Sequence, residues 1–95
     1  MAGFFYIMAC ESNTTIYKGS TDDIIRRAYE HKYHLIPGSF SDTYDTTKLV
    51  YYEYYEDITD ARGREAQVGK WSRAKKDKLI SKMNPGWEDL YRDLV

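Results

Sequence analysis

Aromatic and β-branched residues gather in three short runs along the chain, at 4–10, 15–19 and 48–55. Runs of this length and composition, bounded by turn residues, are typical of β-strands. The polar cluster Glu11-Ser12-Asn13-Thr14 separates the first two runs, so we expect these runs to form a hairpin. The first run is almost entirely apolar, which favours a central position in the sheet.

Helical spacing dominates most of the remaining chain. Ser20 or Thr21 is expected to cap the first helix and Ser72 the third, because these residues precede apolar residues with helical spacing. The segment 40–46 follows Pro37-Gly38-Ser39 and is expected to be a loop. We expect helices at about 22–34, at about 57–71, at 73–82 and at 87–94.

These elements together predict one small α+β domain over residues 1–95, in which helices flank a three-stranded antiparallel sheet. The first helix should pack on that sheet through one apolar side. Its members are Ile24, Ile25, Ala28, Tyr29 and Lys32.

Composition narrows the class of protein. The single cysteine, Cys10, rules out an intrachain disulfide and favours a reducing, cytoplasmic environment, and we expect it to be a small buried hydrophobe. The chain shows neither a secretory signal pattern nor an apolar run near the ~20 residues that span a bilayer. We therefore expect a cytoplasmic protein, monomeric and without membrane contact.

The net charge of −1 hides a strong segregation of charge. Binding of a polyanion depends on a local basic surface, so a basic segment predicts a nucleic-acid partner despite the balanced total. Arg73, Lys75 and Lys76, at the start of the third expected helix, are the candidate DNA contacts. The basic residues of this segment are Arg62, Arg64, Lys70, Arg73, Lys75, Lys76, Lys78 and Lys82.

Glu65 is the sharpest single candidate for chemistry, because it falls on the apolar stripe of the second expected helix between Ala61 and Val68. A carboxylate there is costly unless it is paired, hydrogen-bonded or bound to a metal. Two interpretations stay open: an ion pair with Arg27, Arg62 or Arg64 (or exposure at the edge of the stripe), and a metal site. A lone carboxylate would need water and phosphate oxygens as further ligands, which suits Mg²⁺.

Four more side chains are candidates for a site. Tyr6 and Tyr17 fall on neighbouring strands, where they either pack in the sheet or position a water molecule. Arg27 and His31 are four residues apart on the first helix and share a face. Arg27 offers a planar fork for phosphate, and His31 is either a surface histidine or a general base.

The order of these motifs resembles the GIY-YIG nuclease family, in the compact form similar to the catalytic N-terminal part of the UvrC repair nuclease. Phe4-Phe5-Tyr6 stands at the GIY motif and Tyr17-Lys18-Gly19 at the YIG motif. The segment from Asp23 to His31 looks like the arginine helix of the family. The resemblance covers residues 4 to about 87, and Arg64-Glu65 and Met83-Asn84-Pro85 continue it.

This resemblance implies a DNA endonuclease that acts in DNA repair or processing with one Mg²⁺ or Mn²⁺ ion. Glu65 would bind the metal and Arg27 the scissile phosphate. Tyr17, helped by Tyr6, would position or activate the attacking water, and His31 would share in proton transfer.

Two departures from the family pattern leave other functions open. Lys18 replaces the isoleucine of YIG, and the loop Ser41-Asp42-Thr43-Tyr44 is acidic where relatives tend to be basic. They motivate a second hypothesis, a nucleic-acid-binding module of the same fold with little or no turnover. A third hypothesis is a protein-interaction domain that uses the surface of Tyr51 to Tyr55.

Overall fold

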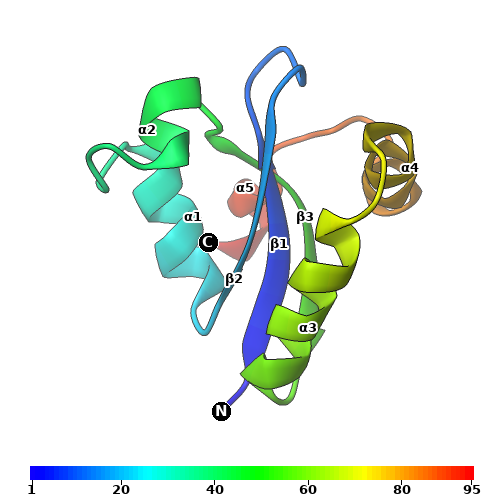
Figure 1. Cartoon of the computed structure of the whole chain (residues 1–95). Coiled ribbons are helices and arrows are strands. Elements are labelled where there is room, and N and C mark those ends of the chain that lie inside the picture. The colour runs from blue at the N-terminus through cyan, green and yellow to red at the C-terminus, as the bar shows by residue number, and fades with distance from the viewer.

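A three-stranded antiparallel sheet is the centre of the computed structural model, which describes residues 1–95 (Figure 1). Its strands are β1 (Gly3–Ala9), β2 (Ile16–Thr21) and β3 (Lys48–Tyr55), in the order β2-β1-β3. Both neighbours of β1 run antiparallel to it. The expected α+β class, the hairpin and the central place of the first strand are confirmed.

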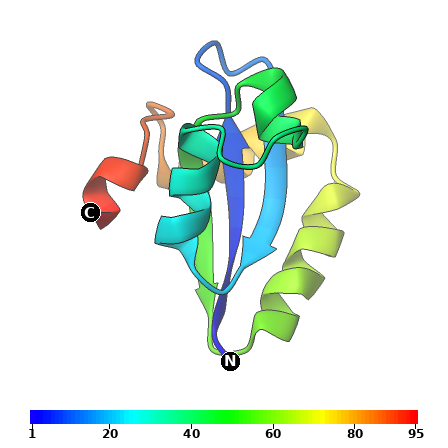
Figure 2. The same cartoon turned by 90° about the vertical axis from the view of Figure 1, so that its left-hand side faces the viewer.

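Helices cover both faces of this sheet, as Figures 1 and 2 show. On one face lie α1 (Ile24–Lys32) and the short α5 (Tyr91–Leu94), which contact each other. On the other face lie α3 (Ile58–Gly69) and α4 (Arg73–Met83). The short helix α2 (Phe40–Tyr44) packs beside α1. None of these helices combines the length and the apolar character needed to cross a membrane.

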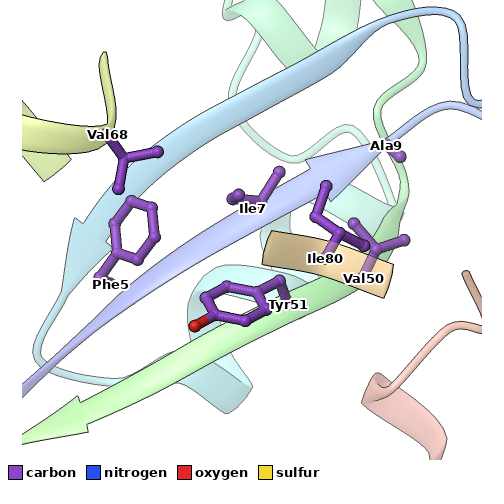
Figure 3. Close-up of a cluster of buried hydrophobic side chains, with 7 residues drawn as sticks. All are labelled: Phe5, Ile7, Ala9, Val50, Tyr51, Val68 and Ile80. Carbon is purple, nitrogen blue, oxygen red and sulfur yellow. The ribbon is translucent and has the colours of Figure 1, made fainter. Parts of the chain in front are cut away.

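Alternation along β1 divides the core into two clusters, because successive side chains of a strand point to opposite faces. Phe5, Ile7 and Ala9 face α3 and α4, where they meet Val68 and Ile80 (Figure 3). The second cluster lies on the α1 face and contains Tyr6, Met8, Ile24, Ala28 and Leu49.

A bulge between β1 and β3 interrupts this alternation. Ile7 pairs with Tyr51 but Met8 pairs with Leu49, so Val50 is the extra residue of β3. Val50 and Tyr51 therefore both belong to the cluster beneath α3 and α4 (Figure 3).

The first helix differs from the expectation at its start and on one side. Asp23, not Ser20 or Thr21, is the N-cap, and its carboxylate accepts from the backbone N–H of Arg26 at 3.0 Å. Ser20 and Thr21 instead extend β2, which continues beyond Gly19. Gly19 is thus a strand residue rather than a bend. The expected apolar side was also too wide, because its members Ile25 and Tyr29 are exposed and His31 is buried in their place.

The segment 40–46 was wrongly expected to be a loop throughout. Residues 40–44 form α2, and the hydroxyl of Ser39 caps this helix by accepting from the N–H of Asp42. A buried hydrogen bond of 2.7 Å between the hydroxyls of Ser41 and Thr46 holds the segment to the body.

Cys10 is also not the buried hydrophobe that we expected. It is half-buried at the start of the hairpin loop, and its sulfur lies 3.4 Å from the hydroxyl of Ser12 and 3.5 Å from that of Thr14. The backbone N–H of Thr15 donates to the same sulfur at 3.3 Å. These hydrogen bonds, Ser12 and Thr14 first, favour the thiolate and lower the pKa of Cys10 to about 6.

Candidate active site

The edge strand β2 carries the candidate site, with α1 on one side and α3 on the other (Figure 1). Tyr17 packs with the cluster on the α1 face, together with Tyr6 from the neighbouring strand. Lys18 and Ser20, which alternate with Tyr17 and Gly19, reach Glu65 on α3. The alternation of β2 therefore distributes the candidate groups around one open edge of the sheet.

A buried hydrogen bond joins Tyr6 to His31. The Tyr6 hydroxyl lies 3.0 Å from Nε2 of His31, and the two residues are 1% and 4% exposed. Burial, reinforced by the neighbouring Tyr17, raises the pKa of Tyr6 well above its ordinary value, so this phenol keeps its proton. Burial and the positive charge of Arg27 lower the pKa of His31 to about 4, so its ring is neutral near pH 7.

These protonation states fix the direction of the bond. We assign the phenol of Tyr6 as the donor and the unprotonated Nε2 of His31 as the acceptor. The ring proton of His31 then lies on Nδ1, which is buried and has no hydrogen-bond partner. The pair is therefore a rigid support rather than a source of charge.

The lack of a side chain at Gly19 leaves room for the Tyr6 ring. The two residues face each other across the β1–β2 pairing. A Cβ at position 19 would lie 2.5 Å from the Tyr6 hydroxyl oxygen and 2.7 Å from its Cζ. The glycine of the YIG-like motif is thus needed for room, because any side chain there would displace the phenol.

Tyr17 is the half-exposed member of the aromatic cluster. Its ring centre lies 5.4 Å from that of His31 and 6.4 Å from that of Tyr6. Phe40 of α2 also stacks on it, with 5.2 Å between the ring centres and 30° between the planes. These three neighbouring rings restrict the orientation of Tyr17, while part of its side chain remains exposed.

Arg27 lies one helical turn before His31 and is partly exposed. Its Nε is 3.1 Å from Oε1 of Glu30, in a geometry that leaves both atoms without a hydrogen bond. The charge of Arg27 lowers the pKa of Tyr6 whereas the charge of Glu65 raises it, on top of the dominant effect of burial. Arg27 on α1 and Glu65 on α3 therefore both act electrostatically on the same phenol.

Glu65 is held by two partners on β2. Ser20 donates its hydroxyl proton to Oε1 at 2.8 Å, and Nζ of Lys18 lies 3.7 Å from Oε2. The arginines considered as partners are engaged elsewhere or make no ion pair, since Arg64 pairs with Glu53 at 3.0 Å and Arg27 contacts Glu30. Sequence reasoning flagged Lys18 as unusual but did not pair it with Glu65, and it missed Ser20 in this role.

The donor set at Glu65 fits a divalent metal held largely by other ligands. No group of three or more His, Cys, Asp or Glu side chains that could hold a metal occurs in this chain, so protein side chains would fill only part of the coordination sphere of an ion at Glu65. Its Oε2 already faces a cation, the Lys18 ammonium, at a side chain that is 30% exposed. A partly exposed carboxylate with water and phosphate oxygens around it suits Mg²⁺ or Mn²⁺.

The candidate DNA contacts are apart from this cluster, on α4. The guanidinium of Arg73 is bound by Asp77 at 2.7 Å and by the backbone carbonyls of Thr14 and Asn13, so it fastens α4 to the hairpin loop. Lys75 is exposed, with Nζ 4.2 Å from the centre of the Trp71 ring, and Lys76 is half-buried.

The site is an open edge rather than a cavity. Two pockets occur in the molecule, of about 450 Å³ and about 490 Å³. The first lies beside Arg64 and Lys82, the second beside Cys10 and His34, and neither is lined by Tyr6, Tyr17, Arg27, His31 or Glu65.

Comparison with known proteins identifies the family of this chain. Residues 2–78 match the family described as "GIY-YIG catalytic domain". A UPF0213 protein of Syntrophus aciditrophicus is 37% identical over 82 residues, which cover 86% of this chain and 92% of that protein. A UPF0213 protein of Listeria innocua is 35% identical over 78 residues, covering 82% and 84%.

A solved structure extends the agreement to the fold. The solution NMR structure of a UPF0213 protein from Bacillus halodurans superposes with a TM-score of 0.59 at 26% identity. The match covers 94% of this chain and 93% of that one. The family match spans all five residues of the candidate site, from Tyr6 to Glu65. The chain therefore belongs to the GIY-YIG family and, within it, to the UPF0213 proteins.

Proposed function

We propose that this protein is a divalent-metal-dependent nuclease that hydrolyses phosphodiester bonds in DNA. The observation that carries the proposal is that the edge strand β2 holds an ordered tyrosine, Tyr17, and also contacts one partly exposed carboxylate, Glu65, through Lys18 and Ser20. Arg27 provides a cation on α1, on the Tyr17 side of this strand. The catalytic character of the matched family supports a chemical rather than a purely binding role.

In this proposal Tyr17 orients the attacking water. It is the phenol that solvent reaches, whereas Tyr6 and His31 are buried behind it and act as positioning residues. The water oxygen bonds to phosphorus and the bond to the leaving sugar oxygen breaks. One proton of the water passes to the Tyr17 hydroxyl as that hydroxyl gives its own proton to solvent, and the leaving sugar oxygen takes up a proton from solvent.

Arg27 binds the phosphate. Its Nε–H has no hydrogen bond within the chain, and a guanidinium can donate to two phosphate oxygens at once. Charge that develops on those oxygens in the transition state is stabilised by a cation already in position.

Glu65 would hold the metal through Oε2, with Ser20 fixing the other carboxylate oxygen. When bound, the ion supplies Lewis-acid stabilisation of the phosphate and of the leaving oxygen. Loss of the carboxylate charge should therefore remove metal binding at this site and most of the activity.

Cleavage of plasmid, single-stranded and branched DNA with Mg²⁺ or Mn²⁺, with EDTA as the blank, tests the proposal. We expect Glu65→Gln and Arg27→Ala to lower the rate by about 10²–10³-fold and Tyr17→Phe by about 10²-fold. Glu56→Gln is the matched control, since Glu56 is exposed and makes no ion pair; it should keep the full rate.

The ion pair between Lys18 and Glu65 favours one alternative, the binding module without turnover. That alternative predicts salt-dependent DNA binding with no cleavage under any of these metal conditions. Strand cleavage that disappears in Glu65→Gln would eliminate it.

A further inference from the structure

The ammonium of Lys18 lies beside the carboxylate that we propose as the metal ligand. Its nitrogen lies 3.7 Å from Oε2 of Glu65, while Oε1 accepts a hydrogen bond from Ser20. Both carboxylate oxygens thus face groups of the same strand, and a divalent cation that bound Glu65 would be repelled by the nearby ammonium. The lysine and a metal ion would therefore compete for one carboxylate.

The molecule makes room for this lysine. A Cβ at Gly69 would lie 2.6 Å from Cε and 3.1 Å from Nζ of Lys18, so the lysine side chain crosses α3 at this glycine. Gly69 lies one helical turn after Glu65, on the same face of the helix. It is not among the residues with positive φ, so its small size rather than its conformation fits it to this position.

The contact is nevertheless easy to exchange. The two side chains are 36% and 30% exposed, and at 3.7 Å they form an ion pair without a short hydrogen bond. Pairs of this kind contribute little to stability because water competes with them. The flexible stem of a lysine lets its ammonium move to another anion nearby.

We propose that Lys18 neutralises Glu65 in the free protein and moves to a backbone phosphate when DNA binds along β2. This inference rests on the proposed function and adds a coupling to it. DNA removes the competitor from Glu65, so DNA and the divalent ion bind cooperatively, and each raises the affinity of the other by the same factor. The free protein therefore binds the metal weakly, and it binds the metal tightly only when its DNA substrate is bound.

Binding of Mn²⁺, measured by electron paramagnetic resonance, tests the exchange without relying on activity. The variant Lys18→Met removes the competitor and should tighten Mn²⁺ binding by about tenfold in the absence of DNA. Lys78→Met is the matched control, because it removes the same charge from an exposed position on α4; it should leave the affinity unchanged. Glu65→Gln should abolish binding in all cases.

A second variant separates the position of Lys18 from its charge. Gly69→Ala keeps the lysine but pushes its side chain away from the helix, and the far end of a flexible chain can yield without unfolding the protein. It should also tighten Mn²⁺ binding, by less than Lys18→Met. Circular dichroism of each variant checks that the fold is retained.

The coupling itself is measured by repeating the titration with a short DNA duplex in a Tyr17→Phe background, which slows cleavage. The factor by which DNA raises the Mn²⁺ affinity should be about tenfold larger in the protein that keeps Lys18 than in the Lys18→Met variant. Equal Mn²⁺ affinities of the wild type and the Lys18→Met variant, with metal-dependent cleavage intact, would overturn the exchange and leave the nuclease standing. Absence of Mn²⁺ binding to both would overturn both proposals, and the expected affinities without any cleavage would overturn the nuclease alone.

Discussion

The substitution Gly19→Ala should destabilise the protein through a single contact. The added Cβ would lie 2.5 Å from the Tyr6 hydroxyl oxygen, so that oxygen must move by about 0.9 Å to reach an ordinary contact of 3.4 Å. The Tyr6 ring has little freedom to move, because it is 1% exposed and bonded to His31. The methyl group therefore strains the core and stretches the buried hydrogen bond together.

The expected cost follows from these two effects. Overpacking of a core costs about 1–3 kcal/mol. Loss of a buried hydrogen bond costs about 0.5–1.5 kcal/mol, and the better strand propensity of alanine returns about 0.5 kcal/mol. The net destabilisation should be about 1–4 kcal/mol, and its central value of about 2.5 kcal/mol lowers the urea midpoint by roughly 2.5 M if the m-value is about 1 kcal/mol/M.

Gly63→Ala is the matched control, because no atom lies within 4 Å of a Cβ at that position in α3. It should stabilise the protein by about 0.5–1 kcal/mol through helix propensity alone. Both variants are compared with the wild type by urea unfolding followed by circular dichroism. Tyr6→Phe should cost less in the Gly19→Ala background than in the wild type, since the crowded oxygen is then removed. Equal midpoints for Gly19→Ala and the wild type would refute the steric reasoning.

Three further predictions concern charge. His31 has a pKa of about 4 in the folded chain against 6.5 unfolded, so the unfolded state binds more protons between these values. The contribution of neutral His31 to the free energy of unfolding should therefore be fully present above pH 6.5, and the free energy should fall by about 3 kcal/mol as the pH drops to 4. An NMR titration that finds His31 protonated at pH 6 would contradict this. Iodoacetamide should alkylate Cys10 with a midpoint near pH 6, and Ser12→Ala should raise that midpoint. Replacing Lys75 and Lys76 by methionine should make the plot of log K for DNA association against log [salt] less steep, by about 2 in the magnitude of its slope. An unchanged slope would show that these lysines do not contact DNA.

Local sequence patterns predict most of the fold. The run 48–55 is a strand with the expected bounds, because its aromatic and β-branched residues suit no other buried element. The helix α2 was missed because a five-residue segment is too short to show a periodic pattern of apolar residues. Its Phe40 stacks on the distant Tyr17, a contact that leaves no such pattern in the sequence.

The candidate site was predictable as a set of residues but not as a set of contacts. Glu65 stands out because a carboxylate interrupts an apolar stripe, and this signal is local. Its partners depend on which face of β2 Lys18 and Ser20 occupy, and that face is fixed by the pairing of β2 with β1. The expected arginine partners were wrong for this reason. The burial of His31 likewise depends on the packing of α1 over Tyr6.

The segment that follows α4 completes the sheet. Asn84 is buried and donates to the carbonyl of Val50 at 3.0 Å, and the N–H of Leu90 donates to the carbonyl of Leu49 at 2.7 Å. Asp89 accepts from the N–H of Leu49 at 3.1 Å and pairs with Lys32 of α1. These bonds close the part of β3 that no other strand covers.

The segment that matches the GIY-YIG catalytic domain is therefore shorter than the set of residues that shields the sheet. The family match ends at residue 78, inside α4, yet β3 depends on backbone partners beyond it. A chain cut at that boundary would keep every proposed catalytic side chain and expose an unpaired strand edge, the surface from which proteins aggregate. The shortest stable form of this fold is thus set by the last residues that shield the sheet, not by the last residue with a proposed role in the chemistry.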